Sequence, residues 1–273
     1  MEKTLYVSDL DGTLLHSDQT ISPFTVKIIN DLISQGMLFS YATARSLKTS
    51  RKVTQGFHAQ MPLIVYNGAI VVDSLTNEII LSYFFNKNEI EELIKDLCHH
   101  HVYPLVYQFL NGVEKFSYIE KYNSQGVQAF LDTRKNDDRQ HIVDVISDLY
   151  KGDCFYITCI DEKDKLDALY EKYKHKFRCI YQEDMYLHNQ WLEIMPKNVS
   201  KAHAVTELKK RLKCDRLIVF GDGINDIDMF QVADEAYAVE NAQAELKEIA
   251  DGIIGNHNDD AVAKYLLETF TVK

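Results

Sequence analysis

Near the N-terminus the sequence reads Val7-Ser8-Asp9-Leu10-Asp11-Gly12-Thr13-Leu14. The preceding residues, Thr4-Leu5-Tyr6-Val7, are rich in β-branched and aromatic side chains and predict a buried strand. Asp9 and Asp11 are two positions apart, so in extended backbone their carboxylates project from the same face. Gly12 permits a sharp turn after them. Two carboxylates at the end of a buried strand are unfavourable in a core and suited to binding a cation.

Two other interpretations of this stretch are a solvated turn and a calcium-binding loop. Asp, Gly and Thr are all common in turns, but Asp-x-Asp-Gly-Thr should begin by chance at only about one position in 10⁵. Counted from Asp9, the glycine position of a calcium loop holds Leu14 and its final glutamate position holds Thr20. The calcium loop is therefore excluded, and the plain turn is disfavoured.

The composition of the 273 residues, with 46% hydrophobic and 26% charged, is that of an ordinary soluble globular protein. The formal net charge of −11 disfavours nucleic acid and anionic membranes as the main partners. Five cysteines without a C-x-x-C pair, and the lack of a signal peptide, favour the cytoplasm. No apolar run approaches the roughly 18 residues of a membrane span.

The two ends of the chain predict alternating strands and helices with short links, which implies a parallel sheet. The predicted strands lie at 4–7, 37–43, 62–66, 217–220 and 236–239, and the helices at 23–35, 46–55, 199–212, 225–232, 242–250 and 259–270. Polar residues follow several of these strands, at the edge where open α/β sheets bind ligands. These segments predict one parallel-sheet core domain made of residues 1–82 and 191–273.

The middle of the chain has a different pattern, with hairpins mixed among helices. Asn111-Gly112 between two apolar runs is a strong hairpin signal, and a smaller hairpin at 70–73 and 79–83 precedes this region. The predicted strands lie at 102–110, 113–119, 154–160, 177–182 and 190–196, and the helices at 88–101, 122–131, 139–149 and 161–176. The fold class is therefore α/β, with an α+β domain inserted at 83–190.

A second acidic motif, Gly221-Asp222-Gly223-Ile224-Asn225-Asp226, also follows a predicted strand. It is not a dinucleotide fingerprint, because Asp226 holds the third glycine position, and the sequence has no phosphate-binding G-x-x-x-x-G-K-[ST]. If this strand neighbours the first, the carboxylates of Asp9, Asp11, Asp222 and Asp226 converge. Like charges at that spacing require a cation, and hard oxygen ligands indicate Mg²⁺.

Other residues could hold a phosphate beside these acids. Thr43 offers a hydroxyl at the end of the second strand, and backbone N–H groups near Leu10 and Ala44 could form an anion-binding concavity. Lys201 lies at the start of a predicted helix, where anions are favoured. Taken alone, Thr43 could be an ordinary strand residue and Lys201 a solvated surface lysine.

These motifs, in this order, resemble the four motifs of the haloacid dehalogenase superfamily: D-x-D-G-T-[LV], a threonine after the second strand, a helix lysine and G-D-x-x-x-D. The long insertion, together with Tyr66-Asn67-Gly68-Ala69 and the second acidic motif, is similar to the Cof-like branch with a type IIB cap. Thr43-Ala44-Arg45 departs from the usual Thr-Gly-Arg, although Ala44 still presents its N–H. The resemblance spans the whole chain and implies a Rossmann-like core.

The resemblance also implies roles for the acidic residues. Asp9 would be the nucleophile that forms an aspartyl-phosphate, and Asp11 the general acid and then base. Mg²⁺ would be bound by the side chains of Asp9 and Asp222 and by the backbone carbonyl of Asp11. Asp226 would hold or orient the metal shell, and Asn225 would contact the phosphate or the nucleophile loop.

The resemblance further implies that Thr43 and Lys201 bind the phosphoryl oxygens. Arg45 and Asn67, just past their strands, would contact the rest of the substrate or the hinge. The expected protein is a Mg²⁺-dependent phosphohydrolase of small phosphomonoesters, with sugar phosphates as the favoured class. The inserted domain would be a lid that excludes water and selects the substrate.

Two alternatives differ in function from this expectation. A phosphomutase would share the aspartyl-phosphate step and would need a second phosphate site in the cap, where the basic residues form no obvious cluster. A non-enzymatic sensor of a phosphorylated metabolite would not need Asp9 and Asp11, and both are present. The expected partner is a small phosphorylated metabolite, and the expected assembly a monomer or weak homo-oligomer.

Overall fold

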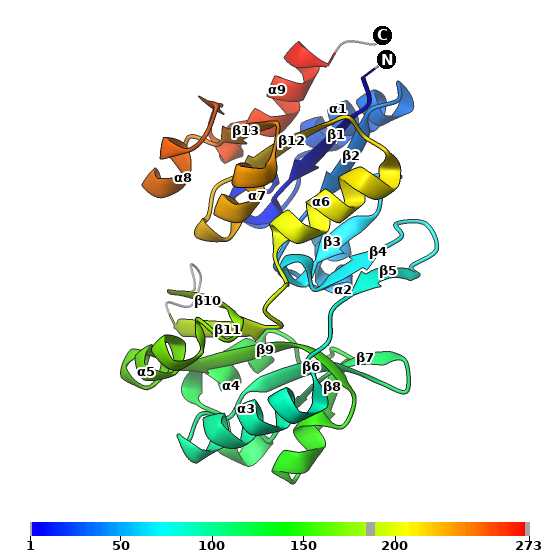
Figure 1. Cartoon of the computed structure of the whole chain (residues 1–273). Helices are drawn as coiled ribbons and strands as arrows, with labels where there is room; N and C mark the ends of the chain where they lie inside the picture. The colour runs from blue at the N-terminus through cyan, green and yellow to red at the C-terminus, as the bar shows by residue number, and fades with distance from the viewer. Residues whose placement is uncertain (1, 184–188, 271–273) are drawn as a thin grey trace. The chain divides into compact units, whose positions relative to one another are not determined.

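The computed structural model describes residues 2–183 and 189–270 (Figure 1). By its internal contacts the chain divides into two compact units. The core unit runs up to Ser82 and again from Val199, and the inserted unit is Tyr83–Asn198. The second division follows Asn198 rather than residue 190, because the strand Gln190–Met195 pairs within the sheet of the inserted unit.

The main sheet of the core unit has five parallel strands in the order β14-β13-β12-β1-β2. These strands are β1 (Thr4–Ser8), β2 (Leu38–Tyr41), β12 (Arg216–Gly221), β13 (Glu235–Ala238) and β14 (Gly252–Ile253). β1 lies beside β12, with Val7 opposite Val219 and Ser8 opposite Phe220. The two acidic motifs therefore follow adjacent strands and begin at the same edge of the sheet.

Helices cover both faces of this sheet, as an open α/β fold requires. They are α1 (Pro23–Ser34), α2 (Leu47–Val53), α6 (Lys201–Leu212), α7 (Ile227–Val232), α8 (Ala244–Glu248) and α9 (Ala261–Thr269). α6 packs beside α7 on one face, and α1 beside α9 on the other (Figure 1). Ser22 begins α1 as predicted, since its side chain accepts a hydrogen bond from the Thr25 N–H.

The predicted third parallel strand belongs to a separate sheet. β3 (Leu63–Val65), β4 (Ile70–Val72) and β5 (Ile79–Ser82) form a three-stranded antiparallel sheet. One parallel bridge, Ala42 to Ile64, joins β3 to the end of β2. The prediction of 62–66 as a full member of the parallel sheet is wrong, because a tight turn at Tyr66–Gly68 returns the chain as β4.

The inserted unit contains a six-stranded sheet in the order β10-β11-β9-β6-β7-β8. Its strands are β6 (Leu105–Leu110), β7 (Val113–Tyr118), β8 (Gln140–Ile142), β9 (Asp153–Asp161), β10 (Arg178–Glu183) and β11 (Gln190–Met195), and its helices are α3 (Lys87–His99), α4 (Gln125–Asp132) and α5 (Lys163–Tyr173). The pairs are antiparallel except β7 with β8. The expectation of a parallel core with an inserted α+β unit is confirmed.

The predicted helix at 139–149 is wrong. This segment contains β8 and a short 3₁₀ turn at Ile146–Tyr150. Ile142 and Val145 contribute to the apolar pattern that suggested a helix, yet each is 53% exposed. Their β-branched side chains favour strand over helix, and the Phe116 N–H donates to the Arg139 carbonyl, which aligns the segment with β7. In the described ranges, no helix has the length and apolar character needed to cross a membrane.

Candidate active site

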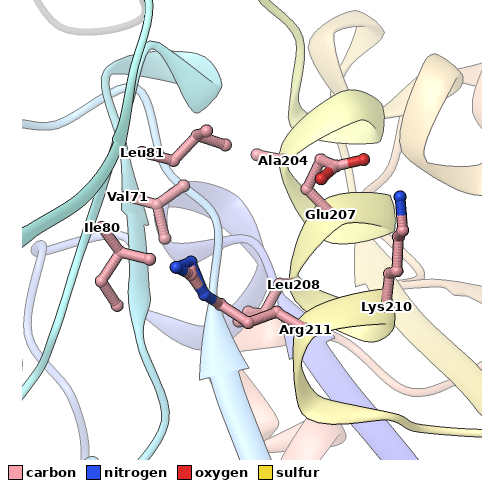
Figure 2. A pocket seen from close by; sticks show the side chains of 8 residues that line it. All are labelled: Val71, Ile80, Leu81, Ala204, Glu207, Leu208, Lys210 and Arg211. Atoms are coloured by element: carbon pink, nitrogen blue, oxygen red, sulfur yellow. The ribbon is translucent and has the colours of Figure 1, made fainter.

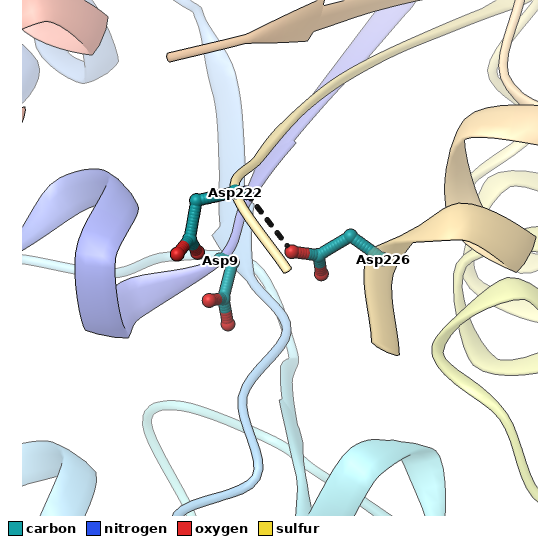
Figure 3. Close-up of side chains that lie close together, drawn as sticks. All are labelled: Asp9, Asp222 and Asp226. Atoms are coloured by element: carbon teal, nitrogen blue, oxygen red, sulfur yellow. Dashed lines mark hydrogen bonds between the residues drawn. The ribbon is translucent and has the colours of Figure 1, made fainter. Parts of the chain in front are cut away.

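Three carboxylates meet at the carboxyl edge of the main sheet (Figure 3). Asp9 follows β1, Asp222 follows β12, and Asp226 lies in the turn before α7. Each offers an oxygen atom within 4.8 Å of the others. Asp9 and Asp226 are buried. The adjacency of β1 and β12 therefore brings both acidic motifs to one point.

Lys201 neutralises part of this charge from the first turn of α6. Its Nζ atom donates to Oδ1 of Asp9 and to Oδ1 of Asp226, both at 2.7 Å. The lysine is only 1% exposed, so the alternative of a solvated surface lysine does not hold. Ser200 sets the start of α6, because its side chain accepts a hydrogen bond from the His203 N–H.

Asp226 holds the second acidic motif in shape. Its Oδ2 atom accepts hydrogen bonds from the backbone N–H groups of Asp222 and Gly223, both at 3.1 Å. With Oδ1 on Lys201, both carboxylate oxygens already have partners in the protein. Asp226 thus orients its neighbours, and with Asp9 and Asp222 it belongs to a group of carboxylates that could hold a metal ion.

The turn after Asp9 approaches Asp222 very closely. Gly12 has φ +74°, and a Cβ atom on it would lie 2.3 Å from Oδ2 of Asp222. Only glycine fits there without displacing the carboxylate. The neighbouring Thr13 hydroxyl donates to Oδ1 of Asp222 at 3.0 Å. We did not assign Thr13 from the sequence as a site residue, although its place in the Asp-x-Asp-Gly-Thr motif was a usable signal.

Burial changes the protonation of this cluster. It raises the pKa of Asp9 well above its usual value, Lys201 opposes the change, and the nearby carboxylates add to it. Burial, and then Asp226, raises the pKa of Asp222 to about 7. Burial disfavours the Lys201 ammonium, but Asp226 and Asp9 outweigh this and raise its pKa. Three carboxylates with one lysine leave an excess of negative charge, and this oxygen donor set fits Mg²⁺.

The side chain of Asp11 lies outside this group, so the expected convergence of four carboxylates is corrected to three. Arg45 donates from Nε to Oδ2 of Asp11 at 2.7 Å and from Nη2 to Oδ1 at 2.5 Å. Its planar guanidinium matches both oxygens. Arg45 also donates to Oε1 of Gln19 at 2.8 Å. Gln19 was missed in the sequence, where nothing distinguished it from a loop residue.

Hydrogen bonds of the backbone and of side chains join four of the remaining predicted site residues, Thr43, Arg45, Asn67 and Asn225. Thr43 is buried, and its hydroxyl accepts a hydrogen bond from the Arg45 N–H at 3.1 Å. The Asn67 N–H donates to the Thr43 carbonyl, and Oδ1 of Asn67 accepts from Nδ2 of Asn225 at 3.2 Å. Leu10 is fully buried beside Asp9 in sequence. β2 and β12 are the two neighbours of β1 in the sheet. Asn67 therefore links the turn after β2 to the turn after β12.

Two further residues that we missed fix the loops. Gly68 has φ +96°, and a Cβ atom on it would lie 2.3 Å from the Ser200 carbonyl oxygen. The turn at Tyr66–Gly68 thus packs directly on the start of α6. Asn241 donates from Nδ2 to the Gly12 carbonyl at 2.7 Å. Asn241 had no sequence signal, whereas Gly68 stands in the Tyr66-Asn67-Gly68-Ala69 motif.

Comparison with known proteins agrees with this geometry. The family described as haloacid dehalogenase-like hydrolase matches residues 6–266. The chain belongs to this family. Within it, the chain falls in the Cof-like group, as the resemblance of its motifs implied.

Relatives cover nearly the full length of this haloacid dehalogenase-like hydrolase. A protein of Buchnera aphidicola subsp. Baizongia pistaciae named "Putative phosphatase" is 28% identical over 98% of this chain and 99% of its own. The 5-amino-6-(5-phospho-D-ribitylamino)uracil phosphatase YitU of Bacillus subtilis is 24% identical over 98% of each chain. The crystal structure of TM0651 from Thermotoga maritima matches with a TM-score of 0.81 and 26% identity, over 99% of this chain and 98% of that one. The expectation of a phosphatase of this family is confirmed at that level.

Proposed function

We propose that this chain is a Mg²⁺-dependent phosphohydrolase that cleaves small phosphomonoesters through an aspartyl-phosphate on Asp9. The observation that carries the proposal is the buried contact of Lys201 with Asp9 and Asp226, directly beside Asp222. A buried ammonium next to a nucleophilic carboxylate can offset charge that develops on a transferring phosphoryl group. A purely structural ion pair would not need the second acidic motif at the same point.

The metal would be held by the carboxylates of Asp9 and Asp222 and by the backbone carbonyl of Asp11. Asp226 would keep the Asp222 turn and Lys201 in place, because both of its oxygens have those partners. When bound, Mg²⁺ would supply positive charge that keeps the buried carboxylates ionised and reduces the repulsion of a phosphate.

In the first step, an oxygen of the Asp9 carboxylate attacks phosphorus, and the bond between phosphorus and the ester oxygen breaks. Asp11 donates a proton to the departing oxygen, a role worth about 10²–10⁴ in rate. In the second step, Asp11 takes a proton from water, which attacks phosphorus and breaks its bond to Asp9. Inorganic phosphate is released, and both aspartates return to their starting forms.

The remaining predicted residues would bind the transferring phosphoryl group. Lys201 and the Thr43 hydroxyl would contact its oxygens, together with the backbone N–H groups of Leu10 and Ala44. Asn225 would contact this group or the nucleophile loop, and its hydrogen bond to Asn67 would hold it in place. Arg45 donates two hydrogen bonds to the Asp11 carboxylate. When that carboxyl carries a proton, Arg45 would have to give up this two-point contact.

The favoured substrates are phosphorylated small metabolites, with sugar phosphates as the proposed class. One relative is named for a substrate with a phosphorylated ribityl chain, a sugar alcohol, which supports this choice. The net charge of −11 disfavours nucleic acids. The inserted unit would select the substrate and exclude water as a type IIB cap, because the core unit carries every residue of the proposed chemistry.

Turnover of p-nitrophenyl phosphate by the full chain tests this function. We expect hydrolysis with Mg²⁺, loss of activity in excess EDTA, and recovery when Mg²⁺ is added back. A panel of sugar and nucleotide phosphates would then rank the substrates. A chain that binds phosphorylated metabolites but turns over none of them with Mg²⁺ would be a sensor, and the proposal would be wrong.

A further inference from the structure

A second feature of the core unit is a groove between α6 and the β4–β5 hairpin (Figure 2). Its volume is about 320 Å³. The residues that line it are Val71, Ile80, Leu81, Ala204, Glu207, Leu208, Lys210 and Arg211. None of them belongs to the acidic cluster, so the groove is separate from the candidate active site.

Five of the lining residues are apolar and three are charged, and the side chain of Arg211 reaches across the groove. Arg211 extends from α6 toward Val71 and Ile80, whereas the ammonium of Lys210 points away from them (Figure 2). The carboxylate of Glu207 stays on the α6 side. Among the described residues Arg211 has no ion pair, whereas Lys209 on the same helix pairs with Asp234 at 2.6 Å. The groove therefore combines a mostly apolar surface with an exposed guanidinium that forms no ion pair among the described residues.

We propose that this groove binds a small amphipathic anion. Its apolar body would lie against Val71, Leu81 and Leu208, and its anionic group would pair with Arg211. A volume of this size suits a small molecule. A guanidinium at one end fixes the orientation of an anionic head group, so the charge and the shape indicate the same class of ligand.

The position of the groove links it to turnover. β5 ends at Ser82, the last residue before the inserted unit, and α6 begins two residues after Val199, where the chain returns. α6 also carries Lys201 in its first turn. A ligand that holds β5 against α6 would therefore restrain both connections and the helix that positions Lys201. This effect on turnover rests on the proposed phosphohydrolase function.

Two fluorescent probes of the same skeleton test the binding site in the full chain. 1-Anilinonaphthalene-8-sulfonate has an apolar body and one anionic group, and N-phenyl-1-naphthylamine lacks the sulfonate. We expect the sulfonate probe to bind one site, and Arg211→Gln to weaken it about tenfold, the loss expected for one charge-assisted pair. Lys210→Gln, the matched control, should change its affinity less than about twofold. Arg211→Gln should leave the neutral probe unaffected, and Ile80→Trp, which fills the groove, should weaken both.

Equal effects of Arg211→Gln and Lys210→Gln would overturn the proposal, since they would indicate general attraction of anions. Failure of the sulfonate probe to bind at one defined site would also overturn the proposal. So would light scattering that finds a dimer which Ile80→Trp dissociates, because a second copy would then occupy the groove.

Saturating sulfonate probe should change p-nitrophenyl phosphate turnover of the wild type and not of Arg211→Gln. If the probe binds through Arg211 and turnover is unchanged, the link to α6 is wrong. If the chain has no activity, the proposed function fails, whereas the binding result stands.

Discussion

The ammonium of Lys201 lies 2.7 Å from Oδ1 of Asp9, across 192 positions of sequence. Both side chains are buried, and the same ammonium contacts Asp226. The pair forms because β1 ends beside the start of α6, where Gly68 lets the Tyr66–Gly68 turn pack against Ser200. A contact between the proposed nucleophile and a buried cation connects the fold directly to the chemistry.

Replacing Lys201 should cost both stability and activity. Lys201→Met leaves the carboxylates of Asp9 and Asp226 buried without their cation, so in EDTA the free energy of unfolding should fall by about 3 kcal/mol or more. With Mg²⁺, kcat for p-nitrophenyl phosphate should fall at least about 100-fold. The matched control is Lys209→Met on the same helix, whose exposed pair with Asp234 should be worth less than about 1 kcal/mol. Similar losses for the two variants in urea unfolding would contradict the role of Lys201.

The stability of the metal-free chain should depend on pH through Asp222. Its pKa is raised from the usual 3.8 to about 7 in the folded chain. The contribution of this carboxyl to the free energy of unfolding is therefore fully present below pH 4 and is lost as the pH rises through 7. Asp222→Asn has no carboxyl to ionise at this position, so this fall in stability with rising pH is removed. In EDTA at pH 8 we expect this variant to melt above the wild type, by about 2–4 °C for each kcal/mol, and the difference to shrink toward pH 5.

Mg²⁺ gives the control for this comparison. The ion should raise the melting temperature of the wild type at pH 8 more than at pH 5, because its ligands must be deprotonated. It should have little effect on Asp222→Asn. A variant that is less stable than the wild type at pH 8 in EDTA would show that the Asp222 carboxylate is not destabilising in the metal-free fold.

Gly36 and Gly68 have nearly the same φ, so substituting each of them separates the cost of backbone strain from the cost of a steric contact. Gly36 has φ +98°, and a Cβ atom on it would meet no other atom within 4 Å, whereas Gly68 has φ +96° and would place that atom 2.3 Å from the Ser200 carbonyl. Gly36→Ala should cost about 1–2 kcal/mol through φ alone and leave kcat unchanged. Gly68→Ala should cost more and should lower kcat, because Ser200 and Lys201 must shift. Equal effects of the two substitutions would mean that the Tyr66–Gly68 turn does not position α6.

The convergence of Asp9 and Asp222 was predictable from the sequence on the condition that their strands are neighbours, because adjacent parallel strands end side by side at one edge of the sheet. The direct pairing of β1 with β12 meets that condition. The buried state of Lys201 was not, since a lysine at a helix start is compatible with solvent. The contact of Arg45 with Asp11 depends on the path of two loops that are 34 positions apart. Local pattern contains no information about that path.

The fold was predictable wherever local pattern and tertiary packing agreed. The strands at 4–7 and 217–220 are apolar runs because both faces of a parallel sheet are covered. The helix expected at 139–149 fails for the opposite reason, since Ile142 and Val145 are exposed and pairing with β7 decides the conformation there. The strand at Gln190–Met195 was found, but its sheet depends on distant partners in β9 and β10.

In the proposed mechanism Asp9 becomes phosphorylated, while Asp11 only moves protons. Asp11→Asn keeps the shape of the side chain and the backbone carbonyl but cannot exchange a proton. A good leaving group such as p-nitrophenolate needs little protonation, so phosphorylation of Asp9 should partly survive in this variant. A sugar alkoxide needs the proton and should react far more slowly. Hydrolysis of the intermediate needs Asp11 as a base, so the phosphorylated form should accumulate.

Mass spectrometry of acid-quenched Asp11→Asn after mixing with p-nitrophenyl phosphate and Mg²⁺ tests this most directly. We expect one added phosphoryl group on Asp9, absent from the matched Asp9→Asn variant. If neither variant ever carries a phosphoryl group, and both lose activity equally for every leaving group, the covalent mechanism is wrong and direct attack by water is the better account.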